Sequence, residues 1–148
     1  MTSLWYIVNV EAAVVQEGRY LTIVRSERES HAAGVLSLPG GKVEHADNTP
    51  NVLEETLRRE LLEEVGVQVK EGIAYVESNA FVADDGEQVI NIVFLCRYKS
   101  GTPTAIDPDE VVAVQWLTTQ EILNHPKTPP WTRQSIELAE RIRAERQW

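Results

Sequence analysis

The chain has 148 residues, of which 43% are hydrophobic and 25% are charged, so it can bury an ordinary core without cross-links. Its 23 acidic and 14 basic residues give a net charge of −9, which argues against a protein that coats duplex nucleic acid. The one cysteine, Cys96, excludes an intramolecular disulfide, and its apolar neighbours predict a buried side chain rather than a nucleophile.

The first part of the chain has the pattern of a β-hairpin. Residues 4–15 and 19–25 are rich in β-branched and aromatic side chains, and residues 16–18, Gln-Glu-Gly, predict the turn between two strands. Trp5 and Tyr6 open the first strand, where we expect one of them to pack inward and the other to face outward.

The next segment leads into a helix. A polar loop over residues 26–34 precedes a short extended run, residues 35–38, that ends in a Pro39-Gly40-Gly41 turn. Residues 52–65 are good helix formers, and Gly66 is placed where a helix would stop.

Two starts compete for this helix. Thr49 can be the N-cap with Pro50 at the first helical position, or Asn51 can be the N-cap with Glu54 three residues later. In either case, leucines recur every four residues and predict one apolar stripe that faces the core, formed by Leu53, Leu57 and Leu61.

The rest of the chain alternates between strands and helices. We expect strands over residues 73–82, 88–99 and 111–117, and helices over residues 118–123 and 132–145. With no linker, internal repeat or composition break in the sequence, these elements predict one α/β domain over residues 1–148. A mixed β-sheet with a helix on each face would bury their apolar stripes.

No targeting segment is recognisable. The N-terminus, Met1-Thr2-Ser3-Leu4-Trp5, lacks the basic and then apolar layout of a signal peptide, and no apolar stretch is long enough to span a membrane. We therefore expect a cytoplasmic protein without a membrane partner.

Three carboxylates gather on the central helix. At about 100° per residue, Glu60, Glu63 and Glu64 fall within an arc of roughly 100°, at the edge of the leucine stripe. Carboxylates packed in this way repel one another unless a hard cation such as Mg²⁺ or Mn²⁺ lies between them. The alternative is a solvated helix whose arginines and glutamates merely pair. The glycine turn before the helix and Gly66 after it favour the metal site.

These residues carry a resemblance to a known family. The segment from Leu38 to Glu44, Leu-Pro-Gly-Gly-Lys-Val-Glu, and then Arg59 to Val67, Arg-Glu-Leu-Leu-Glu-Glu-Val-Gly-Val, resembles the signature of the Nudix hydrolase superfamily. The second segment matches the family pattern at every specified position. The interval from Gly41 to Arg59 is four residues longer than in the pattern, so Asp47 or Asn51 takes the place of the first glutamate, depending on the end from which one counts.

The resemblance implies a fold and a chemistry. The fold would be the family's α/β/α sandwich with a mixed β-sheet. Glu60, Glu63 and Glu64 would hold Mg²⁺, with Mn²⁺ as an alternative, assisted by the carbonyl of Gly40, and Arg59 would orient the glutamates. A metal-activated water would attack a phosphorus atom and cleave a phosphoanhydride bond.

In this family a further ligand or base often comes from a downstream loop. Glu110, just before the strand over residues 111–117, is our candidate by its place in the order of elements. Its rivals, for each of which a solvent-exposed role is the alternative, are Glu77, Asp84, Asp85 and Glu87.

Three residues are candidates for contact with the substrate. Arg25, at the end of the second predicted strand, could bind phosphate oxygens, and Lys42 could assist electrostatically. Trp131 could stack on a base. Each also has a plain structural role open to it, either surface solubility or packing at a helix entry. Arg28 is a weaker candidate than Arg25 for binding the phosphates. The three histidines lack the spacing of metal ligands, so we assign them no chemistry.

The leading functional hypothesis is a pyrophosphohydrolase that acts on a nucleoside diphosphate linked to another group, with a nucleoside triphosphate as the substrate that fits best. An ADP-ribose or nucleotide-sugar pyrophosphatase is the nearest alternative. A non-catalytic nucleotide-sensing module is an alternative of another class, although the intact glutamates favour turnover. The acidic net charge argues against an RNA cap hydrolase. A homodimer is compatible with the sequence.

Overall fold

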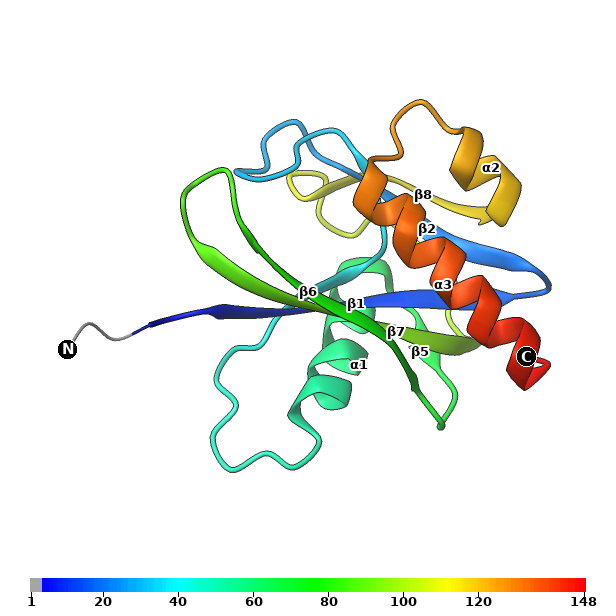
Figure 1. Cartoon of the computed structure of the whole chain (residues 1–148), viewed down its shortest axis with the longest axis horizontal. Coiled ribbons are helices and arrows are strands. Elements are labelled where there is room, and N and C mark those ends of the chain that lie inside the picture. The colour runs from blue at the N-terminus through cyan, green and yellow to red at the C-terminus, as the bar shows by residue number, and fades with distance from the viewer. Residues whose placement is uncertain (1–3) are drawn as a thin grey trace.

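The computed structural model describes residues 4–148, which form one mixed sheet with helices on both sides (Figure 1). The strands are β1 (Ile7–Gln16), β2 (Arg19–Arg25), β3 (Leu36–Ser37), β4 (Gly40–Lys42), β5 (Gln68–Val69), β6 (Ala74–Val82), β7 (Gln88–Ser100) and β8 (Val111–Thr118). The helices are α1 (Val52–Val65), α2 (Thr119–Asn124) and α3 (Pro130–Arg146).

Strand β1 lies at the centre of the sheet. It forms the predicted hairpin with β2, and the turn between them has positive φ angles at Glu17 and Gly18. On its other side β1 pairs with β7 in parallel, in register from Ile7 opposite Val89 to Val15 opposite Arg97. The remaining strand pairs within residues 4–148 are antiparallel, so the sheet is mixed.

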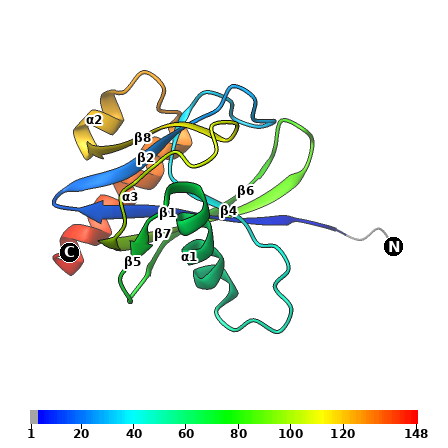
Figure 2. The ribbon, with the colours of Figure 1, turned by 180° about the vertical axis from the view of Figure 1, so that it is seen from behind.

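Helices α1 and α3 cover opposite faces of this sheet (Figures 1 and 2). On one face, Leu57 and Leu61 of α1 pack with Val10 and its neighbours on the strands. On the other face, Ile136 of α3 and Ile122 of α2 pack in a second buried cluster. The predicted α/β/α sandwich with a mixed sheet is confirmed.

Helix α1 begins where the second of the two competing starts places it. Asn51 is the N-cap, in the left-handed conformation and without a side-chain cap. Gly66 ends the helix with φ 72°, and its N–H bonds to the carbonyls of Leu61 and Leu62. The four extra residues lie in the loop from 43 to 51, which projects from the body of the molecule (Figure 1).

The prediction of a Pro39-Gly40-Gly41 turn is wrong. Gly40 and Gly41 belong to strand β4, which pairs with β1. Glycine is needed at position 40 because a Cβ there would lie 1.9 Å from the carbonyl oxygen of Val10. The local composition suggested a turn, whereas the requirement is for close approach between two backbones.

Further differences lie at the ends of elements. Trp5 and Tyr6 both precede β1 and both are exposed, so the prediction that one packs inward is wrong. Helix α3 starts at Pro130 rather than at residue 132, because proline is well suited to the first helical position. The two-residue strand β5 was not predicted.

Other predictions agree with the structure. Thr118 caps α2 through a complete capping box with Glu121. Cys96 is buried on β7, as expected. None of the helices within residues 4–148 is long and apolar enough to cross a membrane. Met1–Ser3, part of the segment considered as a signal peptide, lie outside the described residues.

Candidate active site

A cleft of about 740 Å³ opens beside α1, between the sheet, the loop after β2, the β6–β7 hairpin and the start of α3. Most of the candidate residues line this cleft, although they come from five separate stretches of the chain: Arg25, Gly40, Lys42, Glu60, Glu64, Glu110 and Trp131. Glu63 and Arg59 lie beside it, on the same helix as Glu60. The structure therefore brings the predicted residues to one region.

The carboxylates of Glu60 and Glu64 on α1 pack against the backbone of β4. The N–H of Gly40 donates a hydrogen bond of 3.2 Å to Oε1 of Glu64. A Cβ on Gly41 would lie only 2.2 Å from Cδ of Glu60, so this carboxylate occupies the space that a side chain at position 41 would need. The two glycines thus let the glutamates approach the strand.

This packing disfavours negative charge on the glutamates. Burial raises the pKa of Glu64 to about 8, against the opposing effect of the Gly40 hydrogen bond, and the neighbouring Glu60 and Glu110 raise it further. The pKa of Glu60 is also raised, mainly by burial and in addition by the negative charge of Glu63, while Arg59 has the opposite effect. A cation placed among these oxygens would favour their charged forms, so the site fits a divalent metal such as Mg²⁺.

Arg59 contacts the glutamates as predicted for an orienting residue. Its Nη1 lies 3.1 Å from Oε1 of Glu60 and 3.1 Å from Oε2 of Glu63, and its Nη2 donates to the carbonyl of Lys42 at 3.3 Å. With the side chains in these orientations, no three His, Cys, Asp or Glu residues within 4–148 are arranged to hold a metal ion. The side chain of Glu63, which is 60% exposed, is paired with Arg59.

Arg25 holds the loop that follows β2. Its guanidinium donates to the carbonyl of His31 from Nε, at 3.2 Å, and from Nη2, at 3.0 Å, and it pairs with Glu29 at 3.3 Å. The positive charge of Arg25 also lowers the pKa of Glu64. Arg28, by contrast, forms an exposed ion pair of 2.6 Å with Asp109.

Glu110 lines the same cleft as Glu60 and Glu64 of α1, and its charge is near enough to raise the pKa of Glu64. Its carbonyl accepts a hydrogen bond from the N–H of Ser26, which joins the loop before β8 to the end of β2. Among its rivals, Glu77 accepts hydrogen bonds from Gln134 and Ser135, and Asp84 accepts one from the N–H of Ala32. Glu77 is therefore engaged by α3, while Glu110 lines the cleft together with its other rivals, Asp84, Asp85 and Glu87.

Aromatic side chains stand at the mouth of the cleft. Trp131, the second residue of α3, is 50% exposed there. On the β6–β7 side, the rings of His31 and Phe81 stack with centroids 5.2 Å apart and an angle of 20° between their planes. No role could be assigned to His31 or Phe81 from the sequence, since neither belongs to a motif. Lys42 is exposed at the end of β4.

A polar network on the floor of the cleft was not predicted from the sequence. Asn91 of β7 donates a hydrogen bond of 2.5 Å to Oε1 of Glu11 and accepts one of 2.8 Å from Asn9, both on β1. The hydroxyl of Ser37 lies 3.4 Å from the other oxygen of Glu11. One signal was available: Asn9 and Glu11 stand two residues apart in an otherwise apolar strand, so they share one face of the sheet.

The chain is similar to proteins of one family. The family model described as NUDIX domain matches residues 5–139. The chain is 35% identical over 106 residues to the uncharacterized Nudix hydrolase YfcD of Shigella flexneri, a match that covers 71% of this chain and 54% of that protein. The chain thus spans about half the length of the curated relatives that it matches.

Two solved structures are similar over nearly the whole chain. The MutT protein from Methanosarcina mazei Go1 has 30% sequence identity and a TM-score of 0.76, with 93% of this chain and 94% of that chain covered. The MutT NUDIX hydrolase from Burkholderia pseudomallei has 29% identity and a TM-score of 0.75, with 91% and 98% covered.

Proposed function

Since this chain belongs to the NUDIX domain family, as its signature predicted, we propose that it is a pyrophosphohydrolase that depends on a divalent metal. Its substrate would be a nucleoside diphosphate linked to another group. Within this class we propose a nucleoside triphosphate as the substrate. We further propose that residues 1–148 act as one domain in the cytoplasm, a reducing compartment with which the unpaired Cys96 is compatible.

The observation that carries this proposal is the set of carboxylates packed against β4 at the edge of the cleft. Glu60, Glu64 and the carbonyl of Gly40 would hold the metal, with Glu63 joining them when it leaves Arg59. The donor set consists of hard oxygens, which suits Mg²⁺ or Mn²⁺. When bound, the metal would neutralise phosphate charge and make a water molecule more acidic.

The other residues of the cleft have roles that do not depend on the metal. Arg25, whose Nη1 makes none of its described contacts, would bind a phosphate oxygen while its other nitrogens hold the loop. Glu110 would accept the proton of the attacking water, since it lines the same cleft as Glu60 and Glu64. Lys42 would add positive charge near the phosphates, and Trp131 would stack on the base.

A substrate panel tests the class and the substrate together. The purified chain is incubated with Mg²⁺ and nucleoside triphosphates, ADP-ribose or nucleotide sugars, and the release of pyrophosphate or nucleoside monophosphate is measured. We expect turnover of triphosphates that EDTA abolishes. Faster turnover of ADP-ribose or a nucleotide sugar would favour the alternative pyrophosphatase, and nucleotide binding without turnover would favour a sensing module.

A pair of variants tests the metal assignment. Glu63→Gln should lower kcat by about two orders of magnitude or more because it removes a proposed metal ligand. The same change should shift the free energy of unfolding by less than about 1 kcal/mol, because the ion pair with Arg59 is largely exposed. Glu55→Gln, on the same helix and outside the cleft, is the matched control and should keep parental activity. A near-parental rate for Glu63→Gln would overturn the assignment.

A further inference from the structure

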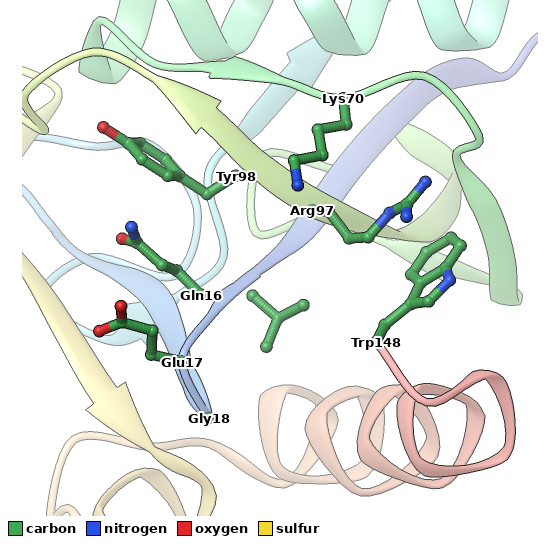
Figure 3. Close-up of a pocket in the computed structure, with 8 residues that line it drawn as sticks. Gln16, Glu17, Gly18, Lys70, Arg97, Tyr98 and Trp148 are labelled. Atoms are coloured by element: carbon green, nitrogen blue, oxygen red, sulfur yellow. The ribbon is translucent and has the colours of Figure 1, made fainter.

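A second pocket of about 330 Å³ lies at the other end of β1 and β7 from the cleft (Figure 3). The parallel register fixes this separation: Asn9 opposite Asn91 lies at the cleft, and Val15 opposite Arg97 lies at the pocket. Six residues of extended strand span about 20 Å. A small molecule in the pocket would therefore not contact the carboxylates of α1.

The pocket is locally positive in an acidic chain. Lys70 and Arg97 supply two cationic side chains, against one acidic side chain in the lining, Glu17, in the turn between β1 and β2. A backbone hydrogen bond of 2.8 Å from the N–H of Lys70 to the carbonyl of Arg97 fixes these two residues beside each other. Within residues 4–148 neither cation has a carboxylate partner at salt-bridge distance.

The guanidinium of Arg97 is held in position without a counter-ion. It lies 4.2 Å from the centroid of the Trp148 ring, and its Nη2 donates to the carbonyl of Glu71 at 3.0 Å. Its Nε is buried and has no acceptor among the described residues. Since a guanidinium has five N–H donors, the protein alone leaves Arg97 short of acceptors.

We propose that this pocket binds a small phosphate oxyanion, inorganic phosphate or diphosphate, between Lys70 and Arg97. An ammonium and an oriented guanidinium together suit such an anion. Figure 3 shows the amine of Lys70 pointing into the pocket and the guanidinium of Arg97 over Trp148. A nucleoside suits the pocket less well, because the Trp148 ring already contacts Arg97 and, at 5.1 Å, Arg146.

Two charge changes at the pocket have opposite expected effects. Lys70→Gln should raise the Kd for phosphate about three- to ten-fold, because it removes one of two cations. Glu17→Gln should lower that Kd about two- to three-fold, because it removes the one acidic side chain in the pocket lining. Lys127→Gln makes the same charge change as Lys70→Gln outside the pocket, and it should leave the Kd unchanged.

The experiment is a titration of the ¹⁵N-labelled full chain with inorganic phosphate, and separately with diphosphate, in EDTA and about 100 mM chloride. We expect the amide signals of Gly18, Lys70 and Tyr98 and the indole signal of Trp148 to shift in a saturable manner. Because the side chain of Lys70 is exposed, the Lys70→Gln variant should fold. Its thermal unfolding is measured as a check.

Three outcomes would overturn the proposal. In the first, the saturable shifts occur only around Gly40 and Glu60, which means that phosphate binds in the cleft. In the second, Lys127→Gln weakens binding as much as Lys70→Gln does, which means that only net charge matters. In the third, folded Lys70→Gln binds phosphate as the parent does. Tighter binding of diphosphate than of phosphate, lost in Lys70→Gln, would identify diphosphate as the preferred ligand.

Discussion

The adjacent glycines of β4 allow the same substitution to be made in two different surroundings. An alanine Cβ at position 40 would lie 1.9 Å from the carbonyl oxygen of Val10 and 2.9 Å from Cα of Glu11, both in the backbone of the central strand. A Cβ at position 41 would lie 2.2–2.6 Å from atoms that all belong to the side chain of Glu60. Neither glycine has a positive φ angle, so alanine is compatible with the backbone at both positions.

The two contacts predict different costs. In Gly40→Ala, β4 must move away from β1, and overpacking of this kind costs about 1–3 kcal/mol, here near the upper end because both clashing groups belong to the backbone. For a chain of this length, that corresponds to a fall in Tm of roughly 5–12 °C. In Gly41→Ala, the end of Glu60 can rotate away at a cost of about 1 kcal/mol, and the entropy lost by the unfolded chain offsets much of it. We therefore expect the Tm of Gly41→Ala to lie within about 2 °C of the parental value.

The effect on catalysis should not follow stability. Gly41→Ala moves the carboxylate of Glu60 out of its place beside β4, and a displacement of about 1 Å in an active site can lower the rate about 100-fold. Thermal unfolding followed by circular dichroism measures the first effect. The rate of Mg²⁺-dependent hydrolysis of the preferred nucleotide, per folded molecule, measures the second.

Two results would refute this reasoning. If Gly41→Ala lowered the Tm as much as Gly40→Ala, the Glu60 side chain would not be the part that yields. If Gly41→Ala kept the parental rate, the place of Glu60 beside β4 would not matter for hydrolysis. The second result would also weaken the case for Glu60 as a metal ligand.

Three further predictions concern other parts of the cleft. Without metal, the pKa of Glu64 is raised to about 8, so the folded state holds its proton more tightly than the unfolded state. The free energy that this bound proton contributes to folding is fully present below about pH 4.5 and is lost as the pH rises toward and through 8. In EDTA, the Tm of the parent should therefore fall more between pH 5 and pH 9 than the Tm of Glu64→Gln. Asn91→Ala removes the partner of Asn9 and of Oε1 of Glu11 and should cost about 1–3 kcal/mol in urea unfolding, whereas the exposed Asn79→Ala should cost little. Trp131→Ala should raise KM for a nucleotide about ten-fold, because base stacking contributes about 1–3 kcal/mol, with a small change in Tm because the ring is half exposed.

Each of these has a clear contrary result. Equal pH dependence of Tm in the parent and in Glu64→Gln would mean that another group titrates. Equal costs for Asn91→Ala and Asn79→Ala would mean that the floor network contributes nothing to stability. An unchanged KM in Trp131→Ala would leave the tryptophan as a packing residue at the helix entry.

The parts of the molecule that could be predicted depend on near neighbours in the chain. Helix α1 follows from the spacing of Leu57 and Leu61 and from Gly66, all within one segment. The carboxylates of the candidate metal site lie on that same helix, so helix geometry alone brings them together. Glu110 was proposed from the order of the elements, and it does line the cleft with Glu64.

The parts that could not be predicted depend on contacts between distant segments. Strand β4 contains two glycines in three residues, and it is extended because it pairs with β1 rather than because of its own propensity. Asn91 meets Glu11 across 80 positions of sequence, and only the parallel register of β1 and β7 brings them together. The register between these two strands cannot be predicted from the sequence of either strand alone.

The buried thiol of Cys96 makes the native chain a convenient background for site-specific labelling. Burial raises its pKa to about 12, so at neutral pH it has almost no thiolate to react with a maleimide. A single engineered thiol on the surface would then carry the label alone. Asn48→Cys would place a fluorophore on the long loop before α1, and its emission would report whether that loop moves when a nucleotide enters the cleft.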